Sequence, residues 1–310
     1  MNEARHPQAR SRPGASPRQS ASVLPPQAGH ERPRRQPPDE DERWSAQTQE
    51  GGHVLDQTSQ TNVTPKASFT SIYDQEDPVA YFSTLRPLEY QAPAHAQGIF
   101  RRCVQALTRT RGSRPVTVAD LCCGYGVNAA LLNHELVLED LYRRYSPTIR
   151  FRTLKARIAA DRKFFAERRL PGTRARVLGL DVAHNALTYA SRVGLLEEAF
   201  TANLESEELR PAPARQIAAA DLVTVTGGLS YIGVETFSRL LAAFPAARKP
   251  WICLFPLRHS DMSELVRFLR TRGLAVEVWA EHGFAHRRFA GPEERSRLAG
   301  AAGHEDDPVR

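Results

Sequence analysis

From about residue 67 onward, short continuous apolar runs alternate along the chain with segments whose apolar residues are three or four positions apart. Short apolar runs rich in β-branched residues predict strands, at 116–121, 176–180, 221–226 and 251–255. Apolar residues three or four positions apart predict helices, at 78–85, 94–108, 127–145, 150–168, 185–193, 234–244 and 260–271. Residues 274–281 and 286–290 are expected to form a closing hairpin. Strands separated by helices favour a mainly parallel sheet with helices on both faces.

The first 65 residues differ from the rest of the chain. They are rich in Pro, Ser, Gln, Arg and Gly, and they contain few large apolar side chains. Such a segment cannot bury enough surface to offset the entropy lost on ordering, so residues 1–65 are expected to be a disordered tail. Residues 66–112 are expected to form an N-terminal helical cap, residues 113–290 the main α/β domain, and residues 291–310 a flexible tail.

The net charge of +7 is unevenly distributed. Residues 1–65 hold eight arginines and eight acids, whereas residues 143–176 hold twelve basic residues and only two acids. This basic stretch predicts a helical insertion at about 146–172, in which Leu154, Ile158 and Phe165 share one apolar stripe. A solvated helix packed on the sheet is the favoured interpretation. Binding of nucleic acid or another polyanion, and a protein contact surface, are the alternatives.

Several classes of protein fit the composition poorly. The chain has no run of about twenty apolar residues, so no membrane span is expected, and its first residues lack the apolar core of a secretion signal. The four cysteines lack zinc-ligand spacing, so no metal site is expected. A reducing cytoplasm is the simplest location.

The sharpest motif is VTVADLCCGYGVNAALL, residues 116–132, which runs from a predicted strand into a predicted helix. Glycines at such a turn let the backbone approach a ligand closely, and a helix N-terminus offers free N–H groups to an anion. These turns lie at the carboxyl ends of parallel strands. Residues 124–129 also fit the G-x-G-x-x-G/A fingerprint, which keeps an NAD-type oxidoreductase as an alternative.

The string DLCCGYG, residues 120–126, resembles the first motif of class I S-adenosylmethionine-dependent methyltransferases, which commonly reads D-L-G-C-G-T-G. Cys122 stands where that family usually has its first glycine, and a cysteine there narrows the turn. The resemblance implies a mainly parallel, seven-stranded Rossmann-like sheet with helices on both faces. Residues 73–97 resemble the N-terminal cap of uncharacterised bacterial members.

Two further segments resemble the same family, so the resemblance covers residues 115–257. RVLGLDVAHNALTYASRVGLLEEAFTANLE, residues 176–205, resembles its second strand and helix, and Asp181 holds the position of the acid that binds the ribose hydroxyls. Helix capping is the other interpretation of Asp181. ADLVTVTGGLSYIG, residues 220–233, resembles strand four and the loop beside the transferable methyl group. Asn203 and Leu204 resemble the pair that contacts adenine. The implied cofactor-binding residues are Asp120, Cys122, Gly124, Gly126, Asp181, Val182, Asn203, Leu204, Thr226 and Gly227.

The spacing between the turn and the acid argues against the dinucleotide alternative. Gly126 and Asp181 are 55 positions apart, whereas dinucleotide-binding folds place the acid about 20 residues after the glycines. The difference implies an extra helical excursion of roughly 30 residues, which matches the basic insertion.

We therefore expect an enzyme that transfers a methyl group from S-adenosylmethionine to an O, N or C nucleophile of a small molecule. A nucleic-acid methyltransferase is less expected, because no Asn-Pro-Pro-Tyr or Asp-Pro-Pro-Tyr string follows the fourth strand. A noncatalytic S-adenosylmethionine-binding protein is a further alternative. Candidates for the acceptor site are Tyr73, His95, Tyr231, Arg258 and His259.

Overall fold

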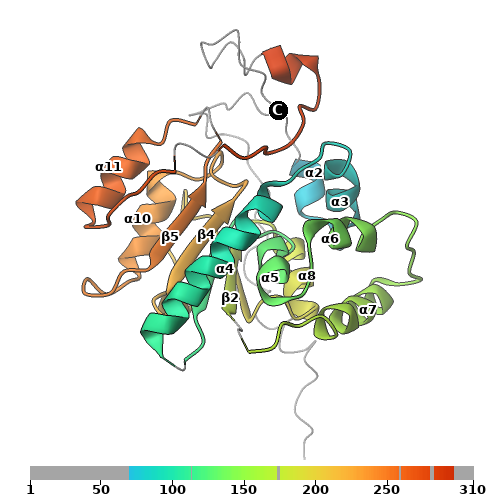
Figure 1. The fold of residues 1–310 in the computed structure, drawn as a ribbon, viewed down its shortest axis with the longest axis horizontal. Helices are drawn as coiled ribbons and strands as arrows, with labels where there is room; N and C mark the ends of the chain where they lie inside the picture. Colours follow the sequence, from blue (N-terminus) through green and yellow to red (C-terminus); the bar gives the residue numbers. More distant parts are fainter. Residues whose placement is uncertain (1–69, 113, 173–174, 258–259, 280–282, 297–310) are drawn as a thin grey trace, which may run out of the picture. The chain divides into compact units, whose positions relative to one another are not determined.

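A sheet of five parallel strands, in the order β3-β2-β1-β4-β5, lies at the centre of the computed structural model (Figure 1). The structure describes residues 70–112, 114–172, 175–257, 260–279 and 283–296, which all belong to one unit, residues 62–310. The strands are β1 (Thr117–Leu121), β2 (Arg176–Asp181), β3 (Glu198–Thr201), β4 (Leu222–Thr226) and β5 (Trp251–Phe255). The predicted disordered tail lies outside the described residues.

The strand order creates a switch point at the centre of the sheet. The chain moves outward from β1 through β2 to β3, and then returns to place β4 and β5 on the other side of β1. All residues of β1 and β4 are buried, as expected for central strands covered on both faces. In doubly wound sheets, ligands bind beyond the carboxyl ends of the strands at such a switch point.

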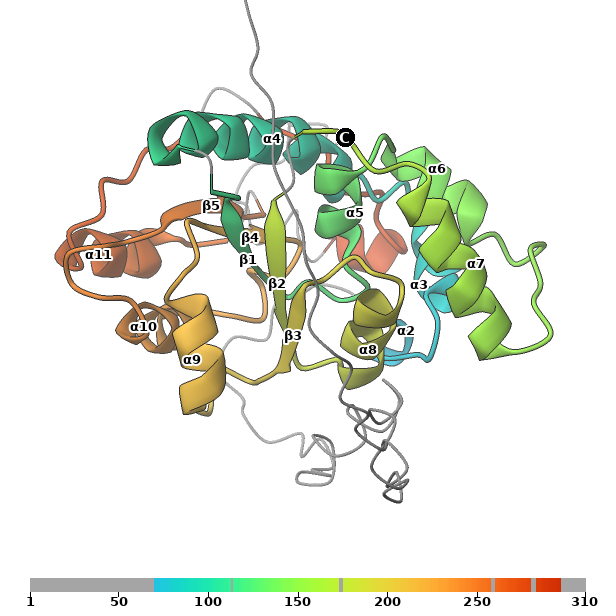
Figure 2. The same cartoon turned by 90° about the horizontal axis from the view of Figure 1, so that it is seen from below.

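Two layers of helices cover the two faces of the sheet (Figure 2). Side chains alternate along β1, so that Val118 joins the core on one face and Ala119 the core on the other. The first core also takes side chains from α4 (Ala92–Arg111), α5 (Val127–Asn133) and α8 (His184–Arg192). The second takes side chains from α9 (Pro211–Ile217), α10 (Val234–Ala242) and α11 (Ser263–Thr271).

The N-terminal segment contributes α2 (Thr70–Tyr73) and α3 (Val79–Leu85) before the long helix α4. The predicted start of α3 at residue 78 lies one residue before the observed start at Val79, whose backbone N–H donates to Asp77 Oδ1 at 2.9 Å. The predicted boundaries of β1, β2, β4 and β5 are confirmed to within one residue.

The single helix predicted over 127–145 is wrong, because the chain breaks between α5 and α6 (Leu138–Arg144). The Asn133 side chain donates to the backbone carbonyl of Ala175 at 2.8 Å and accepts from its N–H at 3.0 Å. Next to it, His134 forms an isolated antiparallel bridge with Arg169. These contacts with a distant segment draw residues 134–137 out of helical geometry.

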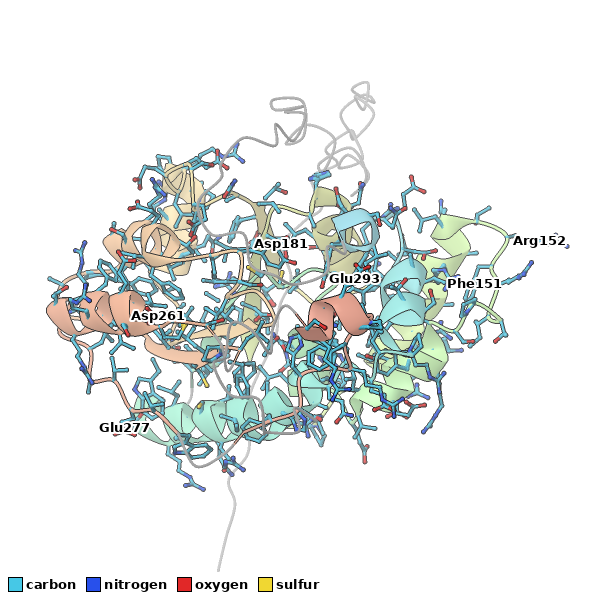
Figure 3. All side chains as sticks on the ribbon, turned by 90° about the horizontal axis from the view of Figure 1, so that it is seen from above. Phe151, Arg152, Asp181, Asp261, Glu277 and Glu293 are labelled. Atoms are coloured by element: carbon cyan, nitrogen blue, oxygen red, sulfur yellow. The ribbon has the colours of Figure 1, made fainter. Side chains whose placement is uncertain are left out.

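The basic insertion contains α7 (Leu154–Ala166), which is tied into the fold by buried charge. Asp161 is fully buried, and it accepts hydrogen bonds from Arg144 Nε at 2.6 Å and from the Tyr189 hydroxyl of α8. Ile158 and Phe165 of the predicted apolar stripe are buried. Arg152, Lys155, Arg162 and Lys163 are exposed, whereas Arg157 is buried and pairs with Asp77 at 3.0 Å. Figure 3 shows Arg152 at the rim of the view.

The closing hairpin, and with it a seven-stranded sheet, is not formed by the described residues. Residues 274–279 and 283–290 contain no strand. Instead, residues 283–296, here called the C-terminal strap, bind the N-terminal segment. His286 O accepts from Gln91 N at 2.8 Å, and Arg288 N donates to Leu88 O at 2.6 Å. The centroid of the Phe284 ring lies 5.1 Å from that of the His95 ring and 5.9 Å from that of the Phe255 ring. These contacts take the place of strand pairing.

Within the described residues, no helix combines the length and the apolar character that crossing a membrane requires.

Candidate functional site

The turn after β1 and the end of β2 are in direct contact at the carboxyl edge of the sheet. Gly124 N donates to Asp181 Oδ2 at 2.7 Å, and Ala183 N donates to Asp181 Oδ1 at 2.9 Å. The register of the parallel strands explains this contact, since Leu121 of β1 lies beside Leu180 of β2. An ionised carboxylate has about four acceptor positions, so both oxygens of Asp181 can accept further hydrogen bonds.

The helix-capping interpretation of Asp181 applies only in part. The N-terminus of α8 is held by Asp74, whose Oδ1 accepts from Asn185 N at 2.6 Å and from Ala186 N at 3.4 Å. Burial raises the pKa of Asp181, and the hydrogen bonds from Ala183 and Gly124 oppose that rise. The neighbouring Val182 is exposed. Figure 3 shows Asp181 toward the centre of the view.

Cys122 adopts the left-handed backbone conformation, with φ of 53°, at the position where the resemblance leads one to expect glycine. Its side chain lies against Gly228 in the loop after β4. A Cβ atom on Gly228 would lie 2.5 Å from Cys122 Cβ and 2.7 Å from its Sγ. The turn is therefore narrowed by Cys122, and glycine at 228 accommodates the thiol. Burial raises the pKa of the Cys122 thiol well above its usual range, which disfavours a role as a nucleophile.

Asp120 organises a buried polar network that joins β1, α5 and β4. Its Oδ1 accepts from Thr224 Oγ1 at 2.6 Å and from Asn128 Nδ2 at 2.9 Å. The same Asn128 side chain is hydrogen bonded to Thr226 Oγ1. Burial raises the pKa of Asp120 to about 7, although the hydrogen bonds from Thr224 and Asn128 lower it. Asp120 Oδ2 is buried and has no hydrogen-bond partner among the described residues.

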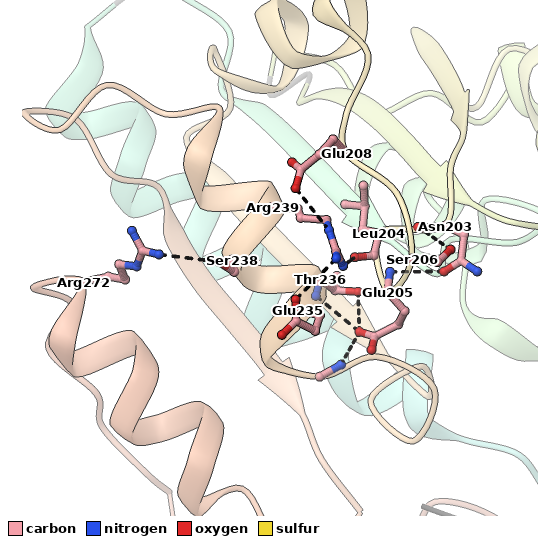
Figure 4. A network of polar contacts seen from close by, with 11 residues as sticks. Asn203, Leu204, Glu205, Ser206, Glu208, Glu235, Thr236, Ser238, Arg239 and Arg272 are labelled. Atoms are coloured by element: carbon pink, nitrogen blue, oxygen red, sulfur yellow. Dashed lines mark hydrogen bonds and ion pairs between the residues drawn. The ribbon is translucent and has the colours of Figure 1, made fainter. Parts of the chain in front are cut away.

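The loop after β4 is held by Glu205, which sequence reasoning missed (Figure 4). Glu205 Oε1 accepts from Gly233 N and from Thr236 Oγ1, both at 2.6 Å, at the start of α10. Buried Leu204 is fixed nearby, since its carbonyl accepts from Arg239 Nη1 at 2.6 Å. A lone glutamate after a strand carries no sequence signal for this role.

Asn203 follows β3 at the same edge of the sheet as Asp181, whose carbonyl accepts a hydrogen bond of 3.0 Å from Ala202 N. The Asn203 side chain is exposed, and its Oδ1 accepts from Glu205 N at 3.1 Å in a local turn. The amide nitrogen has no partner in the described part of the chain. The predicted contact with adenine stays a prediction.

Two of the five acceptor-site candidates come together. The phenol of Tyr73, on α2, lies within electrostatic range of Tyr231, Asp181 and Cys122. Burial, together with a smaller effect of nearby Tyr231, raises the pKa of Tyr73 to about 12. His95 lies on α4 against Phe284, and its Nε2 is buried without a hydrogen-bond partner among the described residues. The remaining candidates, Arg258 and His259, lie outside the described residues.

Two further residues near this edge could not be found from the sequence. The Tyr90 hydroxyl lies against Gly227, where an added Cβ would be only 2.5 Å from it, and glycine at 227 adopts a φ of 69°. Arg287 of the C-terminal strap is within electrostatic range of Tyr73, and it pairs with buried Glu294 at 2.5 Å. Both come from segments that meet only after folding, and Glu294 falls in the stretch that was expected to be a flexible tail.

The arrangement brings together carboxylates, backbone N–H groups and phenols. Among the described residues, no three His, Cys, Asp or Glu side chains gather closely enough to hold a metal ion. The carboxylates, N–H groups and phenols can bind and position an organic ligand through hydrogen bonds at the carboxyl edge of β1, β2 and β4.

No protein-family model matches the chain, and no curated protein matches it. The solved structures that are similar to it include two methyltransferases. One is the magnesium protoporphyrin IX methyltransferase of Synechocystis PCC 6803 with bound S-adenosylmethionine, at 14% identity and a TM-score of 0.34, covering 59% of this chain and 70% of that chain. The other is a putative S-adenosylmethionine-dependent methyltransferase of Methanococcus maripaludis, at 10% identity and a TM-score of 0.32, covering 79% and 86%. TM-scores below 0.5 do not decide what this chain binds, so its function is argued from its own residues.

Proposed function

We propose that this chain is an S-adenosylmethionine-dependent methyltransferase that acts on an O, N or C nucleophile of a small molecule. The observation that supports it most is the 2.7 Å hydrogen bond from Gly124 N to Asp181 Oδ2. It joins the glycine turn after β1 to the acid that ends β2, at the switch point of a sheet ordered β3-β2-β1-β4-β5.

The donors and acceptors at this edge fit an adenosyl sulfonium with a free amino group. Each oxygen of Asp181 accepts one backbone hydrogen bond and keeps capacity for a ribose hydroxyl. The buried Oδ2 of Asp120 lacks a partner among the described residues, and such an atom is stabilised by a donor. Bound S-adenosylmethionine would supply an already activated methyl group.

The protein then has to position the acceptor in line with that methyl group and to exclude water. We assign the cofactor to the turn of residues 122–126, to Asp181 with Val182, to Asn203 with Leu204, and to Thr226 with Gly227. Tyr73 and Tyr231 are assigned to the acceptor side. Residues 66–112 act as the cap, and residues 146–172 form an insertion within the domain 113–290. A cytoplasmic location belongs to the same proposal.

A thermal-shift panel separates this function from the NAD-type alternative. We expect S-adenosylhomocysteine to raise the melting temperature in a concentration-dependent way, because a ligand that binds only the folded state stabilises it. NAD and NADP at the same concentrations should leave it unchanged. Stabilisation by the dinucleotides alone would replace the proposal with an oxidoreductase, and no response to any of these ligands would favour a protein that does not use this cofactor.

The exposed cations of the insertion favour one second candidate, a methyltransferase that acts on nucleic acid. Arg152, Lys155 and Arg162 are all exposed on or beside α7. Retention on heparin that collapses with modest salt would support this candidate, because phosphate contacts are strongly salt dependent. Elution at the salt expected for a protein of this net charge would favour the small-molecule acceptor.

A further inference from the structure

The Cys103 side chain on α4 and the Cys253 side chain on β5 pack against the same core, and their thiols lie within interaction range of each other. Both cysteines are free thiols, and both are partly exposed rather than sealed in the core. They are 150 positions apart in sequence, so only the packing of α4 on the sheet brings them together. Two thiols that meet across packed elements are the arrangement from which a disulfide forms.

The surrounding packing independently places these two positions opposite each other. The Phe100 and Phe255 rings meet edge to face, with centroids 5.6 Å apart, across the same contact between α4 and β5. Phe100 and Cys103 are three positions apart and share one face of α4. Cys253 and Phe255 are two positions apart and share one face of β5. The phenylalanine pair and the cysteine pair are therefore neighbouring contacts in the interface between α4 and β5.

The two thiols also differ in pKa, so that one of them is the more readily ionised and oxidised. The neighbouring Cys253 thiol, together with a smaller effect of the Arg102 guanidinium, lowers the pKa of Cys103 to about 7. The pKa of Cys253 is raised by the same contact. Cys122 and Cys123 differ, because burial raises the pKa of both thiols. The thiolate is the nucleophile in cysteine chemistry, so Cys103 is the cysteine expected to react first.

We propose that Cys103 and Cys253 are a redox modification site, at which a peroxide produces a reversible disulfide between α4 and β5. The Cys103 thiolate attacks one peroxide oxygen; an S–O bond forms, the O–O bond breaks, and hydroxide leaves. Cys253 then attacks the sulfenic sulfur; the S–S bond forms, the S–O bond breaks, and water leaves with the Cys253 proton. The two thiols lose two electrons, and the peroxide is reduced. A dithiol reductant reverses the reaction.

The test uses the full chain and counts its thiols. The reduced protein is treated with hydrogen peroxide, quenched, unfolded in urea and labelled with N-ethylmaleimide, and its intact mass is measured. The untreated protein should carry four labels, one for each cysteine. The treated protein should carry two, with a peptide linking Cys103 to Cys253, and a dithiol should restore all four. Four labels after treatment, or a link between Cys122 and Cys123, would overturn the proposal.

Two single variants separate the steps. Cys103→Ser should keep all three remaining thiols after treatment, because the reactive sulfur is gone. Cys253→Ser should instead accumulate a sulfenic acid at Cys103 that dimedone labels, because the resolving thiol is gone. Circular dichroism before treatment checks that both variants are folded, and Cys253→Ala serves if the serine is not tolerated. Dimedone labelling of Cys122 or Cys123 in place of Cys103 contradicts the assignment.

Discussion

Cys122 shows how one residue can depart from a glycine-rich motif without loss of the turn. It occupies the left-handed region at φ 53°, which costs a residue with a Cβ about 1 kcal/mol or more. Its side chain lies where a Cβ of residue 228 would otherwise be. The two positions therefore form a complementary pair, which joins the turn after β1 to the loop after β4. The motif showed the departure at Cys122, but its complement 106 positions later becomes visible only in three dimensions.

We expect Gly228→Ala to destabilise the protein by about 1–3 kcal/mol, because the new methyl group overlaps the Cys122 side chain. Adding Cys122→Gly to this variant should recover most of that loss. Urea unfolding of the two single variants and the double variant measures the coupling energy. Strictly additive effects would show that the two side chains do not compete for the same space.

Asp120 is predicted to make folding depend on pH. Its pKa of about 7 in the folded protein exceeds the ordinary value of 3.8, so the folded state holds the proton more tightly. The stabilisation is fully present below about pH 4 and is lost as the pH rises through 7. Asp120→Asn removes this titration while keeping an acceptor for Thr224 and Asn128.

Urea unfolding at pH 5 and pH 8 measures the effect. The decrease in stability between these values should be smaller in Asp120→Asn than in the original protein by roughly 2–3 kcal/mol. Asp181 lies close enough to Asp120 to influence it, so Asp181→Asn should reduce the same decrease by a smaller amount. Equal decreases in the original protein and in Asp120→Asn would place the Asp120 pKa near its ordinary value.

At the scale of elements, the sequence predicted those parts whose causes are local. The β-branched runs of β1 and β4 and the start of α3 depend on neighbouring residues, and all three appear within one residue of the expected positions. The break after Asn133 depends on Ala175, and the path of the C-terminal strap depends on Gln91 and Leu88. The spacing of apolar residues continues without interruption past Asn133, so no local pattern could reveal that the helix ends there. The same reasoning explains why Glu205 and Arg287 were missed while Asp181 was not.

The loop before α9 offers a matched pair of glutamates for testing what holds α10 and the loop after β4. Glu205 is partly buried and accepts from Gly233 N and Thr236, whereas Glu208 is 75% exposed and forms an ion pair with Arg239 (Figure 4). Glu205→Ala should reduce stability by about 1–2 kcal/mol, since it removes the acceptor for the first N–H groups of α10. Glu208→Ala should change it by less than about 0.5 kcal/mol.

Thermal unfolding of the two glutamate variants gives the comparison, and S-adenosylhomocysteine affinity gives a second readout. We expect weaker binding in Glu205→Ala alone, because Thr226 and Gly227 precede the loop that Glu205 holds. Similar losses of stability in both variants would mean that charge, rather than the contact with α10, is responsible.

At the scale of the whole unit, long-range contacts gather around one edge of the sheet. The turn after β1, the end of β2 and the loop after β4 meet there. The segment around α2 reaches the same edge: Asp74 accepts a hydrogen bond from the start of α8, and Tyr125 of the turn after β1 donates to the Gln75 carbonyl at 3.0 Å. These two contacts fix the segment around α2 to the turn. The C-terminal strap is hydrogen bonded to Leu88 and Gln91 of the N-terminal segment. Elements from both ends of the described chain thus surround the position assigned to the ligand.

The most direct measurement is calorimetric titration of S-adenosylhomocysteine into the original protein and into Asp181→Ala, with Glu277→Ala as a control for loss of an exposed acid. We predict binding by the original protein and by Glu277→Ala with equal affinity. Asp181→Ala should bind about 100-fold more weakly while melting as a folded protein, because two hydrogen bonds to a charged acceptor are lost. Unchanged affinity in Asp181→Ala, or no heat with the original protein, would contradict the account.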